Sequence, residues 1–308
     1  MFSRKRLRAF WPRERFPRAR RVLAGAYRSS NQMRFLAWSI GSKLRFGPTR
    51  WATVYQGLRI RVLTDDYRGY RVAVLRGTQR EKIDVWNQIV GFKPDVCVDV
   101  GANYGEFSVS AAALGARQMI AIEANPLLIP CLRATLGQYQ ATAVIHAAIA
   151  DRDGEDTDFF FNARETGSAS IAAASPSSGP NRYGTDVSSA KVPTRRLDTL
   201  VPELLGAQPR SLLLKVDVEG FEEAVLAGVG GLISQASWWR AIIEFNPSAL
   251  RNSGSDPARV WEKLREFPGF VIDGTAVNEQ KLARLEARLP LVTPGECDVL
   301  IGFGSPPP

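Results

Sequence analysis

The chain has 308 residues, of which 45% are hydrophobic and 23% charged, so collagen-like and wholly disordered proteins are excluded. No run of about 18 apolar residues occurs, which argues against a membrane span. The chain has only three cysteines, too few for a disulfide scaffold or a zinc site formed by thiolates alone. The net charge of +9 lies at the start of the chain, because residues 1–30 hold ten Lys or Arg and one acid.

The basic start of the chain predicts an N-terminal extension over residues 1–50, partly disordered or helical. Aromatic side chains alternate with Arg and Lys there, which favours a solvated tail or, second, a contact to an anionic membrane surface. Docking to nucleic acid or protein and an organellar transit peptide are the remaining alternatives. The apolar stretch 22–27 is too short for a secretory signal. We therefore expect a cytoplasmic protein, with peripheral contact at the inner membrane face as the open alternative.

Residues 51–95 are expected to lead into the core. The pattern predicts strands over 53–63 and 70–75, joined by a polar turn. It then predicts a helix that Thr78 and Glu81 cap, with an apolar stripe formed by Ile83, Trp86, Ile89 and Val90.

Strands and helices alternate over residues 96–308, which predicts one α/β domain with a mostly parallel sheet covered by helices on both faces. The expected strands are 96–100, 119–122, 142–149, 212–218, 241–245, 270–273 and 298–303. Helices are expected over 104–114 and from Pro126, behind Asn125 as its cap. A Gly- and Ser-rich insert at about 151–190 interrupts the alternation; its length suggests a lid, and Phe159–Phe161 within it suggest an extra strand.

A glycine loop follows the first of these strands, in the segment Asp99–Gly105. Gly101 allows a ligand to approach the backbone, and Asn103 tolerates the unusual angles of a tight turn. The G-x-x-x-G spacing differs from that of dinucleotide binders, and Asp99 suits a cationic amine better than a pyrophosphate.

Glu123 ends the second strand, where an acid can accept both hydroxyls of a ribose. A nucleoside with an amino-acid tail and no phosphate fits this pair of features. The sequence therefore predicts S-adenosylmethionine (SAM) as the cofactor.

Three acids are expected to meet at the carboxyl ends of the later strands: Asp217, Glu219 and Glu244. Lys215 precedes them on a buried strand, so we expect it to pair with Asp217 or Glu244. Asp217 and Glu219 are candidate general bases, with Glu244 third, and crowding of the acids would raise the pKa of such a base. No metal site is assigned, although the same three acids could hold Mg²⁺.

Two further features have simpler interpretations. His146, the only histidine, lies on a predicted strand and is expected to be structural, with a role as base as the minor alternative. Trp238 and Trp239 are expected in the core or an interface rather than in a sugar-binding platform.

The motifs in this order resemble the FkbM-type family of SAM-dependent methyltransferases over roughly residues 70–250. The matching blocks are Asp99–Gly105 with Ser108, Glu123–Pro126, Ala147–Asp151, Gly167–Ser170, Arg196–Leu200, Lys215–Gly220 and Glu244-Phe245. The resemblance implies a Rossmann-like class I fold with a seven-stranded sheet. It also implies methyl transfer to a hydroxyl of a sugar, a glycolipid or polysaccharide, or a secondary metabolite.

The resemblance further implies the cofactor contacts. The methionine part of SAM would lie against the loop residues Asp99, Gly101, Ala102, Asn103 and Gly105. Glu123 would hold the ribose, and Ala147 and Ala148 would lie near the adenine.

Three other functions stay open: a SAM-binding protein without turnover, a nucleotide-dependent oxidoreductase, and a nucleic-acid methyltransferase recruited by the basic start. The missing G-x-G-x-x-G argues against the oxidoreductase. The expected acceptor is a small molecule, a glycan or a lipid-linked compound, with nucleic acid not favoured. The oligomeric state is not predicted.

Overall fold

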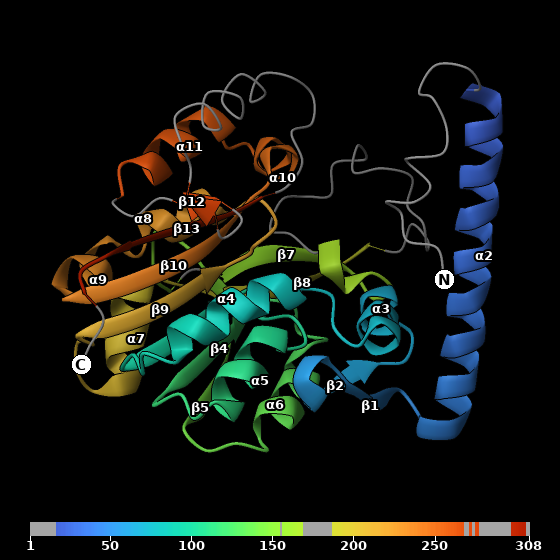
Figure 1. The fold of residues 1–308 in the computed structure, drawn as a ribbon, viewed down its shortest axis with the longest axis horizontal. Coiled ribbons are helices and arrows are strands. Elements are labelled where there is room, and N and C mark those ends of the chain that lie inside the picture. Colours follow the sequence, from blue (N-terminus) through green and yellow to red (C-terminus); the bar gives the residue numbers. More distant parts are fainter. Residues whose placement is uncertain are drawn as a thin grey trace.

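The centre of the molecule is an eight-stranded sheet, seen in a computed structural model that describes residues 17–154, 156–168, 187–267, 271–272, 275–276 and 297–305. The strand order is β12-β11-β13-β10-β9-β3-β4-β5 (Figure 1). The strands are β3 (Val96–Val100), β4 (Met119–Glu123), β5 (Thr142–His146), β9 (Ser211–Val216), β10 (Trp238–Phe245), β11 (Val271–Ile272), β12 (Thr275–Ala276) and β13 (Cys297–Phe303). The five neighbours from β10 to β5 are parallel, and β13 lies antiparallel to β10 and β11. The predicted mostly parallel α/β sheet is confirmed, with the two-residue strand β12 beyond the expected seven.

Helices cover both faces of this sheet because successive residues of a buried strand point to opposite sides. Val96, Val98 and Val100 pack in one core with residues of α7, α8, α9, α10 and α11, whereas Cys97 packs with α4 and α5 on the other face. The helices are α4 (Arg80–Val90), α5 (Glu106–Ala113), α6 (Ile129–Leu136), α7 (Leu197–Leu205), α8 (Glu222–Ala227), α9 (Gly230–Gln235), α10 (Pro247–Asn252) and α11 (Pro257–Arg265). Among the helices that the structure describes, none has the length and apolar character needed to cross a membrane.

The strand order reverses between β3 and β9. From β3 the chain adds β4 and β5 on one side, and β9 and β10 form the other side. In open parallel sheets, ligands bind beyond the carboxyl ends of strands at such a switch point. The glycine loop after β3 and the acids after β9 therefore meet where a ligand is expected.

A separate N-terminal layer precedes the sheet: α2 (Pro17–Phe46), β1 (Thr49–Thr53), the 3-10 turn η1 (Tyr55–Gly57), β2 (Arg59–Leu63) and α3 (Tyr67–Leu75). Strands β1 and β2 form an antiparallel hairpin, and α2 stands at the edge of the molecule beside α3 (Figure 1). The division of the chain at residues 50 and 95 stays a prediction.

The predicted strand at 70–75 is wrong, because this segment belongs to α3. The buried carboxylate of Asp66 caps the helix by accepting a hydrogen bond from Gly69 N at 2.8 Å. Only Val72 among the apolar residues of the helix is buried, while Val74 and Leu75 are exposed. The alternation of apolar residues was too short to separate a strand from a helix. The predicted strand at 53–63 is likewise divided, since the chain turns at η1 and pairs residues 49–53 with 59–63.

Two predicted helix starts also need correction. The helix over Arg80–Val90 is confirmed with its four apolar residues buried, but Gln79 is its cap residue. The Thr78 side chain donates to Glu106 instead, at 3.0 Å. The helix expected from Pro126 begins only at Ile129, because Asn125 Oδ1 accepts from Leu127 N and forms a turn.

A second, three-stranded sheet contains β6 (Ala148–Ile149), β8 (Val187–Arg195) and β7 (Asp156–Asn162) in that order. The strand predicted over 142–149 is thus divided at Ala147 between the two sheets. The extra strand at Phe159–Phe161 is confirmed as part of β7. The insert predicted at 151–190 is therefore partly β-structure, followed by a short 3-10 turn η2 (Thr166–Ser168), and residues 169–186 lie outside the described part.

Candidate active site

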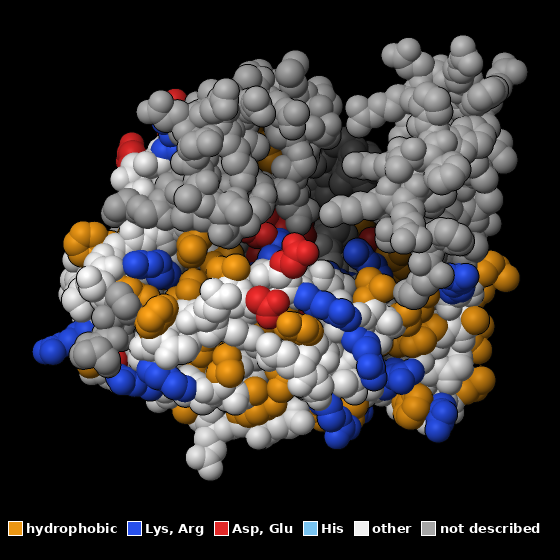
Figure 2. All heavy atoms as spheres, viewed as in Figure 1, with side chains coloured by type: hydrophobic (Ala, Val, Ile, Leu, Met, Phe, Trp, Pro, Cys, Tyr) orange, Lys and Arg blue, Asp and Glu red, His pale blue; other side chains and the backbone are white. Residues whose placement is uncertain are grey.

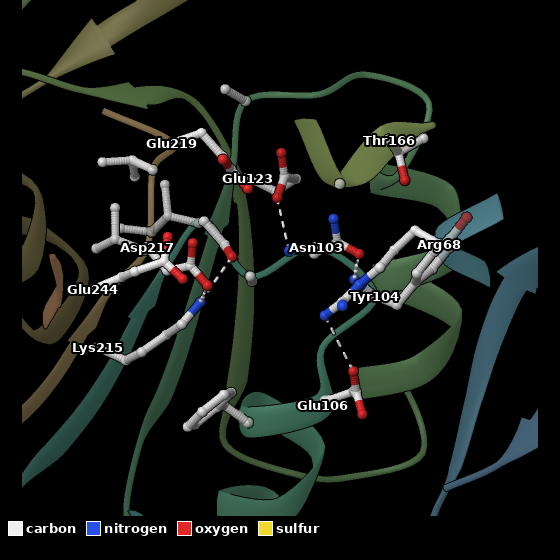
Figure 3. A pocket seen from close by; sticks show the side chains of 18 of the residues that line it. Arg68, Asn103, Tyr104, Glu106, Glu123, Thr166, Lys215, Asp217, Glu219 and Glu244 are labelled. Carbon is white, nitrogen blue, oxygen red and sulfur yellow. Dashed lines mark hydrogen bonds and ion pairs between the residues drawn. The ribbon is translucent and has the colours of Figure 1, made fainter. Parts of the chain in front are cut away.

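A cavity of about 370 Å³ lies at the carboxyl ends of β3, β4 and β9 (Figure 3). Ten of the residues expected to form the site line it: Gly101, Ala102, Asn103, Glu123, Ala147, Ala148, Lys215, Asp217, Glu219 and Glu244. Asp99 and Gly105 are not among the lining residues. Its volume is within the range of about 300–1,000 Å³ typical of small-molecule and cofactor sites.

The glycine loop is shaped by a close approach of two strand ends. Gly101 has φ of +76°, and a Cβ at this position would lie 1.9 Å from the carbonyl oxygen of Asp217. Only glycine fits both the backbone angle and this spacing. Asn103 also has a positive φ, and its side chain accepts a hydrogen bond from Tyr104 N at 2.9 Å. The loop therefore keeps its backbone open toward the cavity.

Glu123 is held with its carboxylate against this loop. One carboxylate oxygen accepts from Asn103 N at 2.7 Å and the other from Asn125 N at 2.8 Å (Figure 3). Burial raises the pKa of Glu123, although both N–H groups work in the opposite direction. The side chain is oriented by two backbone donors and lines the cavity, so its remaining lone pairs fit the two hydroxyls of a ribose.

Lys215 connects the loop after β3 with the loop after β9. Its Nζ donates to the Gly101 carbonyl at 3.0 Å and lies 3.3 Å from Asp99 and 3.4 Å from Asp217. Burial alone would lower the pKa of Lys215, but the carboxylates of Asp217 and Asp99 outweigh it and raise the pKa. The expected pairing with Asp217 is confirmed, and Asp99 is the partner that the sequence did not reveal.

Asp99 is placed behind Lys215 rather than against the cavity. It is fully buried, and its second oxygen accepts from Ser108 Oγ at 2.5 Å. Asp99 thus contacts Lys215, which itself donates to the Gly101 carbonyl, and the expected contact of Asp99 with an amine of the cofactor stays a prediction. Gly105 does not line the cavity either; its φ is +85°, and a Cβ there would lie 2.7 Å from Leu132 Cδ1.

The three acids come together as expected. One carboxylate oxygen from each of Asp217, Glu219 and Glu244 lies within 4.8 Å of the others. Glu219 has a left-handed backbone, with φ of 52°, an arrangement that is costly for this residue and common at functional sites. Lys82 lies between Glu244, at 3.7 Å, and Asp298, at 2.9 Å.

The pKa of Asp217 differs from the expectation. Burial works to raise it, but Lys215 and Lys82 outweigh burial and lower the pKa of Asp217. Crowding of acids therefore does not make Asp217 a strong base. It is a carboxylate that keeps its charge at neutral pH and accepts hydrogen bonds.

Sequence reasoning missed a basic wall, formed by three cations that line the same cavity as these acids. Arg68 and Arg71 come from α3, one helical turn apart, and Lys82 comes from α4. The Arg68 guanidinium donates to Glu106 at 3.3 Å, and Glu106 also accepts from Thr78 N at 2.9 Å (Figure 3). Nothing in the local sequence distinguished these cations from the many others of the basic first third.

One buried carboxylate fixes α3, the helix that supplies the two arginines of the wall. Asp66 accepts from the Tyr104 hydroxyl at 2.6 Å and from both the backbone and the side chain of Thr166 at 2.9 Å. Tyr104 belongs to the glycine loop and Thr166 to the insert. Asp66 therefore joins the N-terminal layer, the loop and the insert at one edge of the cavity.

His146 and the tryptophan pair have structural positions. His146 Nε2 lies 3.0 Å from the Ala124 carbonyl. Trp238 and Trp239 are buried at 2% and 4% exposure, which places them in the core.

Glu222 holds the loop between Asp217 and α8, and we expect it to control how stability depends on pH. Its Oε1 accepts from Val218 N and Gly220 N, and burial raises its pKa from 4.5 to about 7. The folded protein therefore binds this proton up to a higher pH than the unfolded chain does. As pH rises from 4.5 to about 7, the free energy of unfolding should fall by about 1 kcal/mol per pH unit.

Glu222→Gln should flatten this slope in urea denaturation between pH 5 and pH 8. Glu223→Gln is the matched control, because Arg259 and Lys263 bind Glu223 and lower its pKa, so its titration lies below this window. An unchanged slope in Glu222→Gln would show that another group is responsible.

The strand order, the glycine loop at the switch point and the buried acid Glu123 at the end of the next strand are typical of a class I, Rossmann-like, SAM-dependent methyltransferase. The sequence profile of the methyltransferase FkbM domain matches residues 99–270, more than half of the chain. The chain belongs to this family, and its cofactor is SAM.

Solved structures of similar fold have low identity to the chain. A precorrin-6y C5,15-methyltransferase from Geobacter metallireducens is 13% identical, with a TM-score of 0.38 over 74% of this chain and 90% of the other. The plantazolicin methyltransferase BamL is 9% identical, with a TM-score of 0.41 over 77% and 89%. Likeness at this level says nothing about the acceptor of this chain. No curated protein matches the chain.

Proposed function

We propose that the protein transfers the methyl group of SAM to a hydroxyl oxygen of a sugar, a glycolipid or polysaccharide, or a secondary metabolite. The observation that carries this proposal is the acid cluster Asp217, Glu219 and Glu244, which lines the same cavity as the glycine loop and Glu123. A hydroxyl needs hydrogen-bond acceptors that orient its lone pair and take its proton, and this cluster offers them.

The cofactor would lie along the glycine loop. Glu123 would hold the ribose hydroxyls, and Ala147 and Ala148 would face the adenine because both line the cavity. The amino-acid tail would lie against the loop residues from Gly101 to Asn103. When bound there, SAM supplies an electrophilic methyl group on a sulfonium.

The acids would act on the acceptor. Asp217 would accept the hydrogen bond of the hydroxyl and fix its direction. Lys215 binds both Asp217 and the Gly101 carbonyl and so fixes the position of Asp217 relative to the glycine loop. Glu219 and Glu244 would take over the proton as the oxygen is methylated. A weak base suffices for Asp217, because the hydroxyl becomes acidic only as its new bond to carbon forms.

The test is transfer of labelled methyl from SAM to a panel of hydroxylated sugars, glycolipids and small metabolites. Label in an acid-stable ether product, with release of S-adenosylhomocysteine, is the expected result. SAM binding without transfer to any oxygen acceptor would instead support a binding protein without turnover. Label in RNA or DNA, in a salt-sensitive reaction lost on removal of residues 1–30, would support a nucleic-acid methyltransferase.

The basic wall favours an acceptor that carries a carboxylate or phosphate. Arg71 is exposed and lines the cavity, so its guanidinium can bind such a group bidentately. For Arg71→Gln we expect KM for an acidic acceptor to rise by about 10-fold or more, with Kd for SAM unchanged. Arg133→Gln, on the exposed side of α6, is the control. A change in SAM affinity in Arg71→Gln would assign this arginine to the cofactor instead.

One observation favours a second mechanism. The spacing of the three acids, within 4.8 Å of one another, also suits a divalent cation with oxygen ligands. Loss of transfer with EDTA and recovery with Mg²⁺ would establish metal assistance, whereas unchanged rates would support the carboxylate mechanism.

A membrane surface is the second partner that we propose. Residues 1–30 hold ten Lys or Arg and one acid, and this positive charge complements an anionic lipid surface at the cytoplasmic face of the inner membrane. An acceptor linked to lipid would then be reached from the membrane surface.

A further inference from the structure

Helix α2 carries an exposed apolar stripe along its C-terminal half. Met33, Leu36, Ile40 and Leu44 are 67%, 50%, 51% and 85% exposed. Their spacing of three or four residues places all four side chains on one face of the helix. Figure 2 shows hydrophobic side chains along the corresponding right-hand edge of the molecule.

The opposite face of the same helix binds the protein. Phe35 is 5% exposed and packs edge-on against the ring of Tyr67 at 5.6 Å between centroids. Ser39, also buried, donates to Asp65 at 2.8 Å. The stripe is therefore not the core-facing side of α2, because that side is already occupied.

Positive charge flanks the stripe on both sides. At about 100° per residue, Arg34 and Arg45 fall on one side of it and Lys43, which forms an ion pair with Asp65, on the other. The whole of α2 holds seven Lys or Arg and no Asp or Glu. An apolar stripe between cations is the pattern of a helix that lies in the plane of a membrane interface.

The charge also decides between occupants. A second copy of this chain would bring two such helices together, each with seven cations and no Asp or Glu of its own, and only Lys43 among the cations of residues 32–46 has an ion pair, with Asp65 of the same chain. An anionic bilayer offers both an acyl region for the stripe and phosphates for the cations.

We propose that α2 is an interfacial anchor, whose stripe of Met33, Leu36, Ile40 and Leu44 inserts into an anionic lipid surface. This inference rests on the membrane contact proposed for residues 1–30 and deepens it. Insertion of the stripe adds an apolar contribution to the free energy of membrane binding, and salt does not remove that contribution. The anchor would hold the enzyme at the surface through a helix whose other face packs against α3, which supplies Arg68 and Arg71 to the cavity.

The experiment is flotation of the full chain with vesicles of phosphatidylcholine alone or mixed with phosphatidylglycerol, at low and high salt. Wild type should bind the anionic vesicles and keep part of this binding in high salt. The double variant Leu36→Glu/Leu44→Glu should lose at least 10-fold in affinity and all of its salt-resistant binding. Leu204→Glu, at an exposed leucine of α7 with 41% exposure, is the matched control and should bind as wild type does.

Three outcomes would overturn the inference. If the double variant binds as wild type does while removal of residues 1–30 abolishes binding, the contact is electrostatic only. If wild type is a dimer without lipid and the double variant a monomer, the stripe is an interface between copies. If wild type binds no vesicles, the proposed membrane contact fails as well. SAM is also titrated into each variant. We expect the Kd for SAM to stay as in wild type, so a loss of vesicle binding can be told apart from a failure of the proposed enzyme function.

Discussion

Glu123→Ala should bind SAM at least about 100-fold more weakly than wild type. The substitution removes the acceptor for two ribose hydroxyls, and it leaves Asn103 N and Asn125 N without the carboxylate that they hold. Hydrogen bonds to a charged group contribute about 1.5–3 kcal/mol each, so the loss of two accounts for this change. Isothermal titration of SAM is the measurement.

Controls must separate the cofactor contact from the fold. Glu203→Ala removes an exposed glutamate that pairs with Arg195 away from the cavity, and it should bind SAM as wild type does. Glu123→Gln keeps the shape of the side chain and one acceptor oxygen, so we expect an intermediate affinity. Wild-type affinity in a folded Glu123→Ala protein would refute the ribose assignment.

The parallel sheet and most of the cavity could be predicted because their signals are local. A buried parallel strand is a short apolar run, and the polar residues that follow it lie at the carboxyl edge of the sheet by topology alone. Glu123 and Asp217 each stand at the end of such a run. Their convergence therefore follows from chain order without any knowledge of side-chain packing.

The basic wall could not be predicted because it depends on contacts between distant parts of the chain. Asp66 caps α3 locally, but it also binds Tyr104, 38 residues later, and Thr166, 100 residues later. A short apolar alternation at 70–75 has no feature that favours helix over strand until these contacts form. The position of Arg68 in the cavity follows from that helix, so both were missed together.

The change in pKa of Asp217 was missed for a related reason. Sequence order indicated that three acids meet, which alone would raise the pKa of one of them. It did not indicate that Lys82, from α4, reaches the same rim, where it acts together with Lys215 to lower the pKa of Asp217. The balance of charge at a site thus depends on elements whose order in the chain gives no hint of their contact.

Asp217→Asn should reduce kcat by about 100-fold or more while the Kd for SAM stays within a few-fold of wild type. Asparagine keeps the size of the side chain but removes the charge that pairs with Lys215. Its amide oxygen also accepts a hydrogen bond from the substrate hydroxyl less well than a carboxylate does. Because the pKa of Asp217 is lowered, the wild-type carboxylate stays ionised between pH 8 and pH 5, and its titration should not reduce the rate in that range.

The measurement is single-turnover methyl transfer with the best acceptor of the panel, beside SAM titration and thermal unfolding. Asp158→Asn, in an exposed ion pair with Lys191 on the second sheet, is the matched control and should leave the rate unchanged. Asp217→Glu restores the charge on a longer side chain, so partial recovery of the rate would assign the effect to the carboxylate. If Asp217→Asn turned over as wild type does, the hydroxyl would have to be oriented by Glu219 and Glu244 alone, since these are the other acids of the cluster.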